Sequence, residues 1–112
     1  MGCAGEDGEV FIQQNFASNL PSPFTAISFP EDNGYSKERW ELGKKLFYDN
    51  VLSIDSTLNC GSCHKAELSF SDDVAFSKGV KDRDGLRNSP SLANIGYHPY
   101  FTREGGVPTL EQ

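Results

Sequence analysis

The sequence predicts one small domain whose regular structure is helical, joined by long loops and preceded by an extended N-terminal arm. With 112 residues the chain has the length of a single domain. Residues 1–34 contain acidic residues, glycines and three of the six prolines, without a sustained period of 2 or 3.6 residues. From Ser36 to Phe47 the apolar residues follow a helical period. We therefore expect an arm or linker over residues 1–34 and a folded domain over residues 35–112.

The composition excludes several classes of protein. Ten basic residues against sixteen acidic ones give a formal net charge of −6, which argues against nucleic acid as a partner. The longest purely apolar runs have three residues, as at residues 46–48, whereas about 20 are needed to span a bilayer. No P-loop, dinucleotide-binding glycine motif or nucleophile elbow occurs. Three cysteines do not make a disulfide framework.

The clearest helix is expected over residues 36–47. Ser36 can cap its N-terminus. Trp40, Gly43 and the pair Leu46 and Phe47 then fall on one face. Gly43 weakens a helix by about 1 kcal/mol relative to Ala, which close approach of another helix or of a flat ligand would explain. An ordinary core helix explains the same face.

The later elements are expected to be short. Turn-forming residues predict loops over residues 49–59 and 78–90. A short helix is expected over residues 90–95, with Ser89 as its cap and a proline at its first position. Thr109 looks like the cap of a further helix, so we expect the chain to continue as part of a longer protein.

The sequence Cys60-Gly61-Ser62-Cys63-His64 is the motif that carries chemistry. Residues three apart on a helical turn project from neighbouring positions, so Cys60 and Cys63 can present two thiols to the two vinyl groups of one haem. His64 then lies under the ring as the proximal iron ligand. Gly61 and Ser62 are small where the chain crosses the porphyrin edge. A chain of this size buries only about 65% of its unfolded surface, so such a group would supply much of the core.

Three other interpretations of the cysteines compete with covalent haem. Zinc needs four ligands, and beyond the motif only Cys3 and His98 offer soft donors. A thioredoxin-like dithiol requires a βαβ context that the flanking sequence lacks. A structural thiol pair is the third alternative.

The sixth coordination position of the iron is a separate question. The only methionine is Met1, and His98 is the only other histidine. His98 could close the site and give a bis-histidine haem, or it could be an exposed residue of an aromatic loop. An open site would let the iron activate peroxide, and favours an enzyme over an electron carrier.

Five segments carry a resemblance to a known family: residues 42–49, 52–64, 70–72, 87–94 and 105–111. In this order they resemble the N-terminal haem domain of bacterial di-haem cytochrome c peroxidases and of the related MauG enzymes. The motif at Cys60 is shared by all c-type cytochromes. The segment from Asn88 to Asn94, Asn-Ser-Pro-Ser-Leu-Ala-Asn, is much more particular.

The resemblance implies an all-α, cytochrome c-like fold with one covalent haem c, cut from a longer two-domain enzyme in the periplasm. Its N-terminal haem would reduce hydrogen peroxide to water. Electrons would come from a small redox donor protein through the missing C-terminal haem domain. The resemblance also implies that Asn88 contributes to a calcium site between the two haem domains.

Three departures from the family pattern limit what carries over. Residues 67–88 contain no histidine, so the distal histidine of some members is absent there. Arg103 stands where the family often has a tryptophan between the haems. The distal glutamine and glutamate of the family would fall beyond Gln112, so no catalytic residue is assigned within this chain.

Two alternative functions follow from the same residues: a small c-type electron carrier, and a MauG-like oxidase acting on a protein substrate. A chain made without the export-compartment machinery would carry no haem. Cys3 is a candidate for the lipid-bearing first residue of a lipoprotein, and an incidental exposed thiol is the alternative.

Overall fold

The computed structural model describes residues 20–27 and 29–111. The chain divides into two compact units, Met1–Gly43 and Lys44–Gln112. The division into an arm over residues 1–34 and a domain over residues 35–112 stays a prediction.

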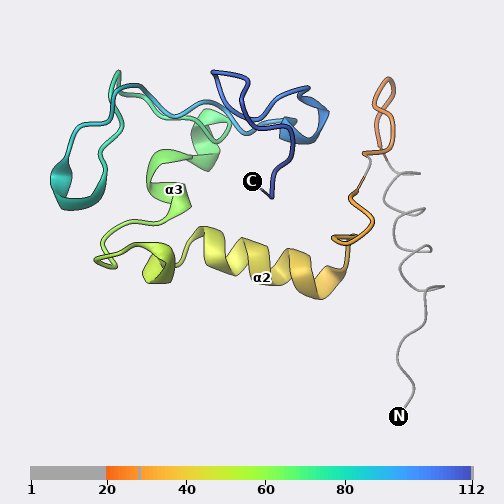
Figure 1. Cartoon of the computed structure of the whole chain (residues 1–112), viewed down its shortest axis with the longest axis horizontal. Helices are drawn as coiled ribbons and strands as arrows, with labels where there is room; N and C mark the ends of the chain where they lie inside the picture. Colours follow the sequence, from red (N-terminus) through yellow and green to blue (C-terminus); the bar gives the residue numbers. More distant parts are fainter. Residues whose placement is uncertain (1–19, 28, 112) are drawn as a thin grey trace, which may run out of the picture. The chain divides into compact units, whose positions relative to one another are not determined.

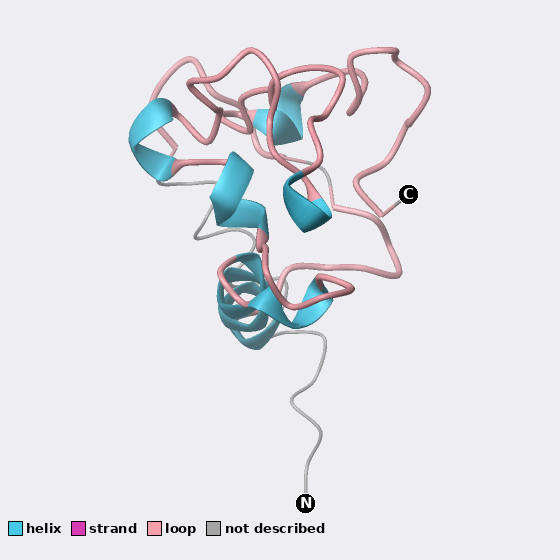
Figure 2. Cartoon of the chain, turned by 90° about the vertical axis from the view of Figure 1, so that its left-hand side faces the viewer, coloured by secondary structure: helices cyan, strands magenta, loops and turns pink. Residues whose placement is uncertain are grey.

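Short helices separated by long loops make up the regular structure of the described residues (Figure 2). The helices are α2 (Lys37–Phe47), η1 (Asn50–Leu52), α3 (Cys60–Cys63), η2 (Ala66–Leu68), η3 (Val80–Asp82) and η4 (Ile95–Tyr97). Within these residues there is no strand, and the only β-type pairings are two isolated bridges, Lys65 with Ser71 and Lys78 with Asp84. This part of the chain is therefore helical without a sheet. No described helix is long and apolar enough to cross a membrane.

The long helix α2 confirms the helix expected over residues 36–47. Its first turn is capped by Ser36, whose Oγ accepts a hydrogen bond from the backbone N–H of Arg39 at 3.2 Å. Lys44 and Lys45 lie in the last turn, where positive charge interacts favourably with the helix dipole. A Cβ built on Gly43 has no described atom within 4 Å. No described residue therefore makes the close approach that would require glycine at this position.

A closed loop follows η2 and leads out through η3 and back (Figure 1). Its two arms are joined where the N–H of Ser77 donates to the carbonyl of Arg87 at 3.1 Å and the N–H of Gly85 donates to the carbonyl of Ser77 at 2.9 Å. Lys78 and Asp84 form an ion pair across the loop at 2.7 Å. The expected loop over residues 78–90 is thus confirmed, and the 3₁₀ turn η3 lies within it.

The prediction of a short helix over residues 90–95 is wrong. Residues 90–92 have no regular secondary structure, residues 93–94 form a turn, and a 3₁₀ turn begins only at Ile95. Their polar groups bond to distant segments instead, since the N–H of Ser89 donates to Ser77 Oγ at 2.9 Å and Ser91 Oγ donates to the carbonyl of Ser69 at 2.6 Å. Residues 109–111 form bends and turns rather than the opening of a helix.

None of the hydrophobic residues in the described part of the chain is buried. Leu46, Phe47 and Phe70 are partly exposed, and Ile54 and Leu86 are 92% and 90% exposed. The short elements therefore do not enclose a core among themselves.

Gly85 offers a test of the closed loop. A Cβ at Gly85 would lie 2.9 Å from the carbonyl oxygen of Ser77, which is backbone held by the loop's own hydrogen bonds. We expect Gly85→Ala to lower the free energy of unfolding by about 1–3 kcal/mol, measured by urea denaturation. Gly79→Ala is the matched control, because its Cβ would meet the carbonyl of Arg83 at an ordinary 3.5 Å. Equal effects of the two substitutions would contradict the described loop geometry.

Candidate functional site

The helical turn α3 carries both motif cysteines, and its N-terminus is closed by a capping box between Asn59 and Ser62. Asn59 is the N-cap, and its Oδ1 accepts from the N–H of Ser62 at 3.0 Å. In return, Ser62 Oγ accepts from the N–H of Asn59 at 3.1 Å. This reciprocal capping box satisfies two backbone donors of a turn too short to be stable alone. The helical placement of Cys60 and Cys63 is confirmed.

The cap is itself held by the preceding loop. Asn59 Nδ2 donates to Asn50 Oδ1 at 2.9 Å, and Asn50 Nδ2 donates to the carbonyl of Ser56 at 3.0 Å. Two asparagine side chains therefore connect η1 to the start of α3. The loop expected over residues 49–59 delivers the chain to the motif in this way.

Both motif cysteines are free thiols. Cys60 is exposed, and Cys63 is half-buried with its Sγ 3.6 Å from the carbonyl oxygen of Lys78. Because they lie at the two ends of one helical turn, they meet the requirement for two attachment points on one edge of a flat ligand. Cys3 lies outside the described residues.

His64 follows directly on α3, and the backbone fixes its ring. Its N–H donates to the carbonyl of Cys60 at 2.9 Å. Its Nδ1 lies 2.8 Å from the carbonyl oxygen of Phe70. A carbonyl only accepts, so Nδ1 carries the proton and Nε2 is left with a lone pair to bind a metal. The sequence motif does not reveal the Phe70 carbonyl, because any residue supplies one.

The loop that presents the Phe70 carbonyl is strained. Ser69 and Phe70 have φ of 56° and 59°, in the left-handed region, which costs about 1–2 kcal/mol per residue for side chains other than glycine. The N–H of Phe70 donates to the carbonyl of Lys65 at 2.8 Å, and the N–H of Lys65 donates to the carbonyl of Ser71 at 2.9 Å. The Phe70 ring meets the ring of Phe47 edge-on at 6.0 Å.

A cluster of charges lies directly after His64. Lys65 Nζ is 3.1 Å from Asp72 Oδ1 and 2.5 Å from Asp73 Oδ1, and the Asp72 side chain is only 5% exposed. The hydrogen bonds that Lys65 donates to Asp73 and then to Asp72 raise the pKa of Lys65 to about 12. The hydrogen bond from Lys65 outweighs desolvation and lowers the pKa of Asp72 to about 2.

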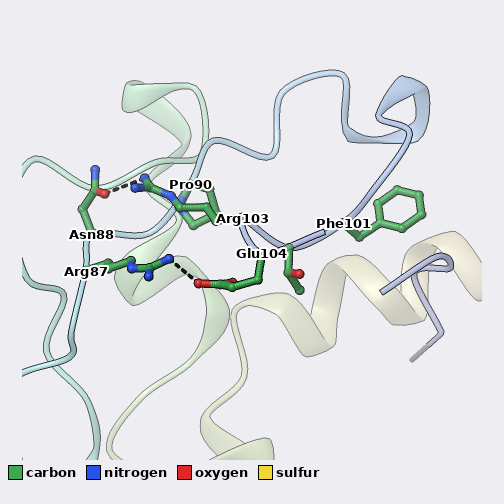
Figure 3. Close-up of a pocket in the computed structure, with 7 residues that line it drawn as sticks. Arg87, Asn88, Pro90, Phe101, Arg103 and Glu104 are labelled. Carbon is green, nitrogen blue, oxygen red and sulfur yellow. Dashed lines mark hydrogen bonds and ion pairs between the residues drawn. The ribbon is translucent and has the colours of Figure 1, made fainter. Parts of the chain in front are cut away.

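Asn88 lines a pocket of about 260 Å³ together with Arg87, Arg103 and Glu104 (Figure 3). Its Oδ1 accepts a hydrogen bond from Arg103 Nη2 at 2.6 Å, and Arg87 pairs with Glu104 beside it. The oxygen that a calcium ion would use is thus engaged by a guanidinium. Nor do the described residues contain a cluster of three acidic, histidine or cysteine side chains. This environment by itself does not fit a calcium site.

His98 and Met1 are the other residues considered as ligands of the iron. His98 is exposed and ends η4, where its backbone N–H donates to the carbonyl of Ile95 at 3.0 Å. Met1 lies outside the described residues.

The comparisons with known proteins agree on one family. Residues 37–112 match the family model CCP_MauG, described as di-haem cytochrome c peroxidase. The chain therefore belongs to the di-haem cytochrome c peroxidase family, whose prosthetic group is haem c.

Individual relatives cover most of this chain but little of their own length. Cytochrome-c peroxidase IdrP1 from Pseudomonas sp. (strain SCT) is 36% identical over 91 residues, 81% of this chain and 24% of the relative. Cytochrome c551 peroxidase from Pseudomonas aeruginosa is 42% identical over 63 residues, 56% of this chain and 18% of the relative. The crystal structure of a MauG-like protein associated with microbial copper homeostasis superposes with a TM-score of 0.78 at 39% identity, covering 83% of this chain and 27% of that one.

The residues at α3 fit covalent haem c. Two thiols stand at the ends of one helical turn, and the next residue has one ring nitrogen committed to a carbonyl and the other available. Zinc would need four ligands around one point. Among the described residues, no three histidine, cysteine or acidic side chains are grouped so that they could hold a metal ion.

Gly61 tests the packing around the motif. Its Cβ would lie 2.8 Å from Cδ1 and Cε1 of the exposed Tyr48 ring, so we expect Gly61→Ala to displace the ring at a cost of about 0.5–1.5 kcal/mol of unfolding free energy. In a Tyr48→Ala background most of this cost should disappear, and a double-mutant cycle by chemical denaturation measures the coupling. Additive effects of the two substitutions would show that the ring does not lie against Gly61.

The ion pair between Lys65 and Asp72 predicts a specific loss of stability in acid. Because the pKa of Asp72 is lowered from 3.8 to about 2 by folding, its contribution is complete above about pH 4 and is lost as the pH falls towards 2. Unfolding free energy measured from pH 5 to pH 2 should therefore fall less steeply in Asp72→Asn than in the parent. Glu67→Gln is the control, since no described ion pair involves Glu67, and it should keep the parent's slope. Parallel curves for Asp72→Asn and the parent would contradict the ion pair.

Proposed function

We propose that this chain is the peroxidatic haem domain of a longer di-haem peroxidase. The enzyme would reduce hydrogen peroxide to two molecules of water, with two electrons and two protons. The carrying observation is the fixed geometry of His64, whose Nδ1 is committed to the Phe70 carbonyl, next to two free thiols on one helical turn. Family membership supports this assignment.

Each motif residue has a separate task in this proposal. Cys60 and Cys63 hold the haem through thioether bonds, and His64 Nε2 binds its iron. Haem c supplies an iron centre that exchanges electrons and binds small oxygen species. No side chain of this chain is assigned as the acid–base group. Together with the helices of the described residues, these roles support a cytochrome c-like, all-α domain.

We propose that the iron keeps an open sixth position. Residues 67–88 contain no histidine, and His98 is exposed at the end of η4. A second candidate function, oxidation of a protein substrate, is favoured by the superposition on the MauG-like crystal structure. An electron carrier with a closed site is the third.

The remaining domain and partners are proposed from the family. The chain spans about a quarter of the length of its curated relatives, 24% of IdrP1. We place a second haem domain in the rest of the enzyme, with a small redox protein as donor and the periplasm as location. A basic donor would suit the net charge of −6.

Cys3 is the proposed site of a lipid anchor. A calcium ion between the domains would need Arg103 to leave Asn88 and oxygen ligands from the second domain.

The haem-binding role is tested on the enzyme exported to a compartment with the haem-attachment machinery. We expect a pyridine haemochrome spectrum of covalent haem c, and a high-spin signal that shifts when peroxide is added. Cys60→Ala and Cys63→Ala should each reduce covalent attachment, and His64→Ala should abolish peroxide reduction by the reduced enzyme. Cys3→Ala is the matched cysteine control and should leave haem content unchanged.

The same spectra separate the candidate functions. A low-spin haem that does not react with peroxide would replace the peroxidase with an electron carrier. A peroxide-reactive haem that turns over only with a protein substrate would favour the oxidase. Absence of haem from the exported protein would refute all three.

A further inference from the structure

The left-handed turn at Ser69 and Phe70 is not required by the motif itself. Two consecutive residues with side chains adopt φ of 56° and 59°, a region that serine and phenylalanine rarely occupy. The turn brings the carbonyl oxygen of Phe70 to 2.8 Å from His64 Nδ1. Strained backbone of this kind persists only where the surrounding structure imposes it. The groups that hold this turn are therefore candidates for a role at His64.

Two serine hydroxyls connect this turn to a distant segment, one on each side of Phe70. Ser91 Oγ donates to the carbonyl of Ser69 at 2.6 Å, across 22 residues of sequence. Ser71 Oγ donates to the carbonyl of Ser89 at 2.9 Å, across 18 residues. Neither bond follows from the local geometry of a turn, because both partners belong to separate parts of the chain.

The segment that carries these partners is itself fixed. The N–H of Ser89 donates to Ser77 Oγ at 2.9 Å, and the two hydroxyls lie 3.0 Å apart. Pro90 restricts the backbone between Ser89 and Ser91. Ser91 Oγ also accepts from the N–H of Ala93 at 3.1 Å, which orients the hydroxyl towards Ser69. The segment is thus an anchored support for the turn.

We propose that Ser71 and Ser91 are positioning residues for His64. By holding the backbone on both sides of Phe70, they fix the distance and direction of the Phe70 carbonyl, and so the strength of its hydrogen bond with His64 Nδ1. The partner of the second ring nitrogen sets ring orientation and raises ligand basicity in metal-bound histidines. The inference rests on the proposed binding of haem iron by His64.

The direction of the effect follows from charge. A strong hydrogen bond at Nδ1 makes Nε2 a better electron donor, which stabilises ferric over ferrous iron and lowers the reduction potential. Loosening the turn weakens that bond. The potential should therefore rise, and the iron–histidine bond should weaken.

The test uses the haem-loaded, exported enzyme with Ser71→Ala, Ser91→Ala and Ser91→Thr. Two quantities are measured for the haem held by His64: its midpoint reduction potential and the iron–histidine stretching frequency of the ferrous form by resonance Raman spectroscopy. We expect both alanine variants to raise the potential and to lower the stretching frequency, and Ser91→Thr, which keeps the hydroxyl, to restore both towards the parent values. Ser53→Ala is the matched control, since it removes a comparable hydroxyl bond, 2.8 Å to Asp55, away from His64.

The outcomes distinguish positioning from mere support of the fold. Lower thermal stability with unchanged potential and stretching frequency in both alanine variants, as expected for Ser53→Ala, would overturn the proposal. Loss of haem from both alanine variants would also overturn it, because the hydroxyls would then be needed for folding. A parent enzyme without haem would refute the proposed function instead.

Discussion

The hydrogen bond between His64 Nδ1 and the carbonyl of Phe70 is the constraint on which the site depends. It fixes the tautomer and the ring plane, and it makes Nε2 the available nitrogen. Three features hold this one carbonyl in place. They are the left-handed turn at Ser69 and Phe70, the backbone hydrogen bonds of Lys65, and the hydroxyls of Ser71 and Ser91. The N-terminus of α3, where Cys60 lies, is stabilised separately by the capping box of Asn59 and Ser62.

The second constraint is the shortage of buried surface. None of the hydrophobic side chains in the described part of the chain is buried, and the helices after α2 have only three or four residues each. Hydrogen bonds between polar side chains and backbone therefore define much of the local structure, and each contributes only about 0.5–1.5 kcal/mol net. A haem held at Cys60 and Cys63 would provide the apolar surface against which such segments can pack. On this account the prosthetic group is the core of the domain.

The sequence predicts the parts of the molecule that depend on local signals. The Ser36 cap and the apolar period locate α2, and the motif spacing places Cys60 and Cys63 on one turn. The short helix expected after Ser89 failed because its serines bond to residues 12 to 22 positions away, which no local pattern reveals. The Phe70 carbonyl could not be foreseen because any residue supplies a carbonyl, and the Tyr48 ring meets Gly61 through a tertiary contact. The contact of Asn88 with Arg103 is likewise tertiary.

Amide hydrogen exchange of the enzyme with and without covalently attached haem is the most direct test of this account. The N–H groups of Lys65 and Phe70, which close the turn behind His64, report whether the site persists. We predict slow exchange at both in the haem-loaded enzyme and a large loss of protection in the haem-free chain. Equal protection in the two forms would contradict the claim that the haem is the core around which these short elements are ordered.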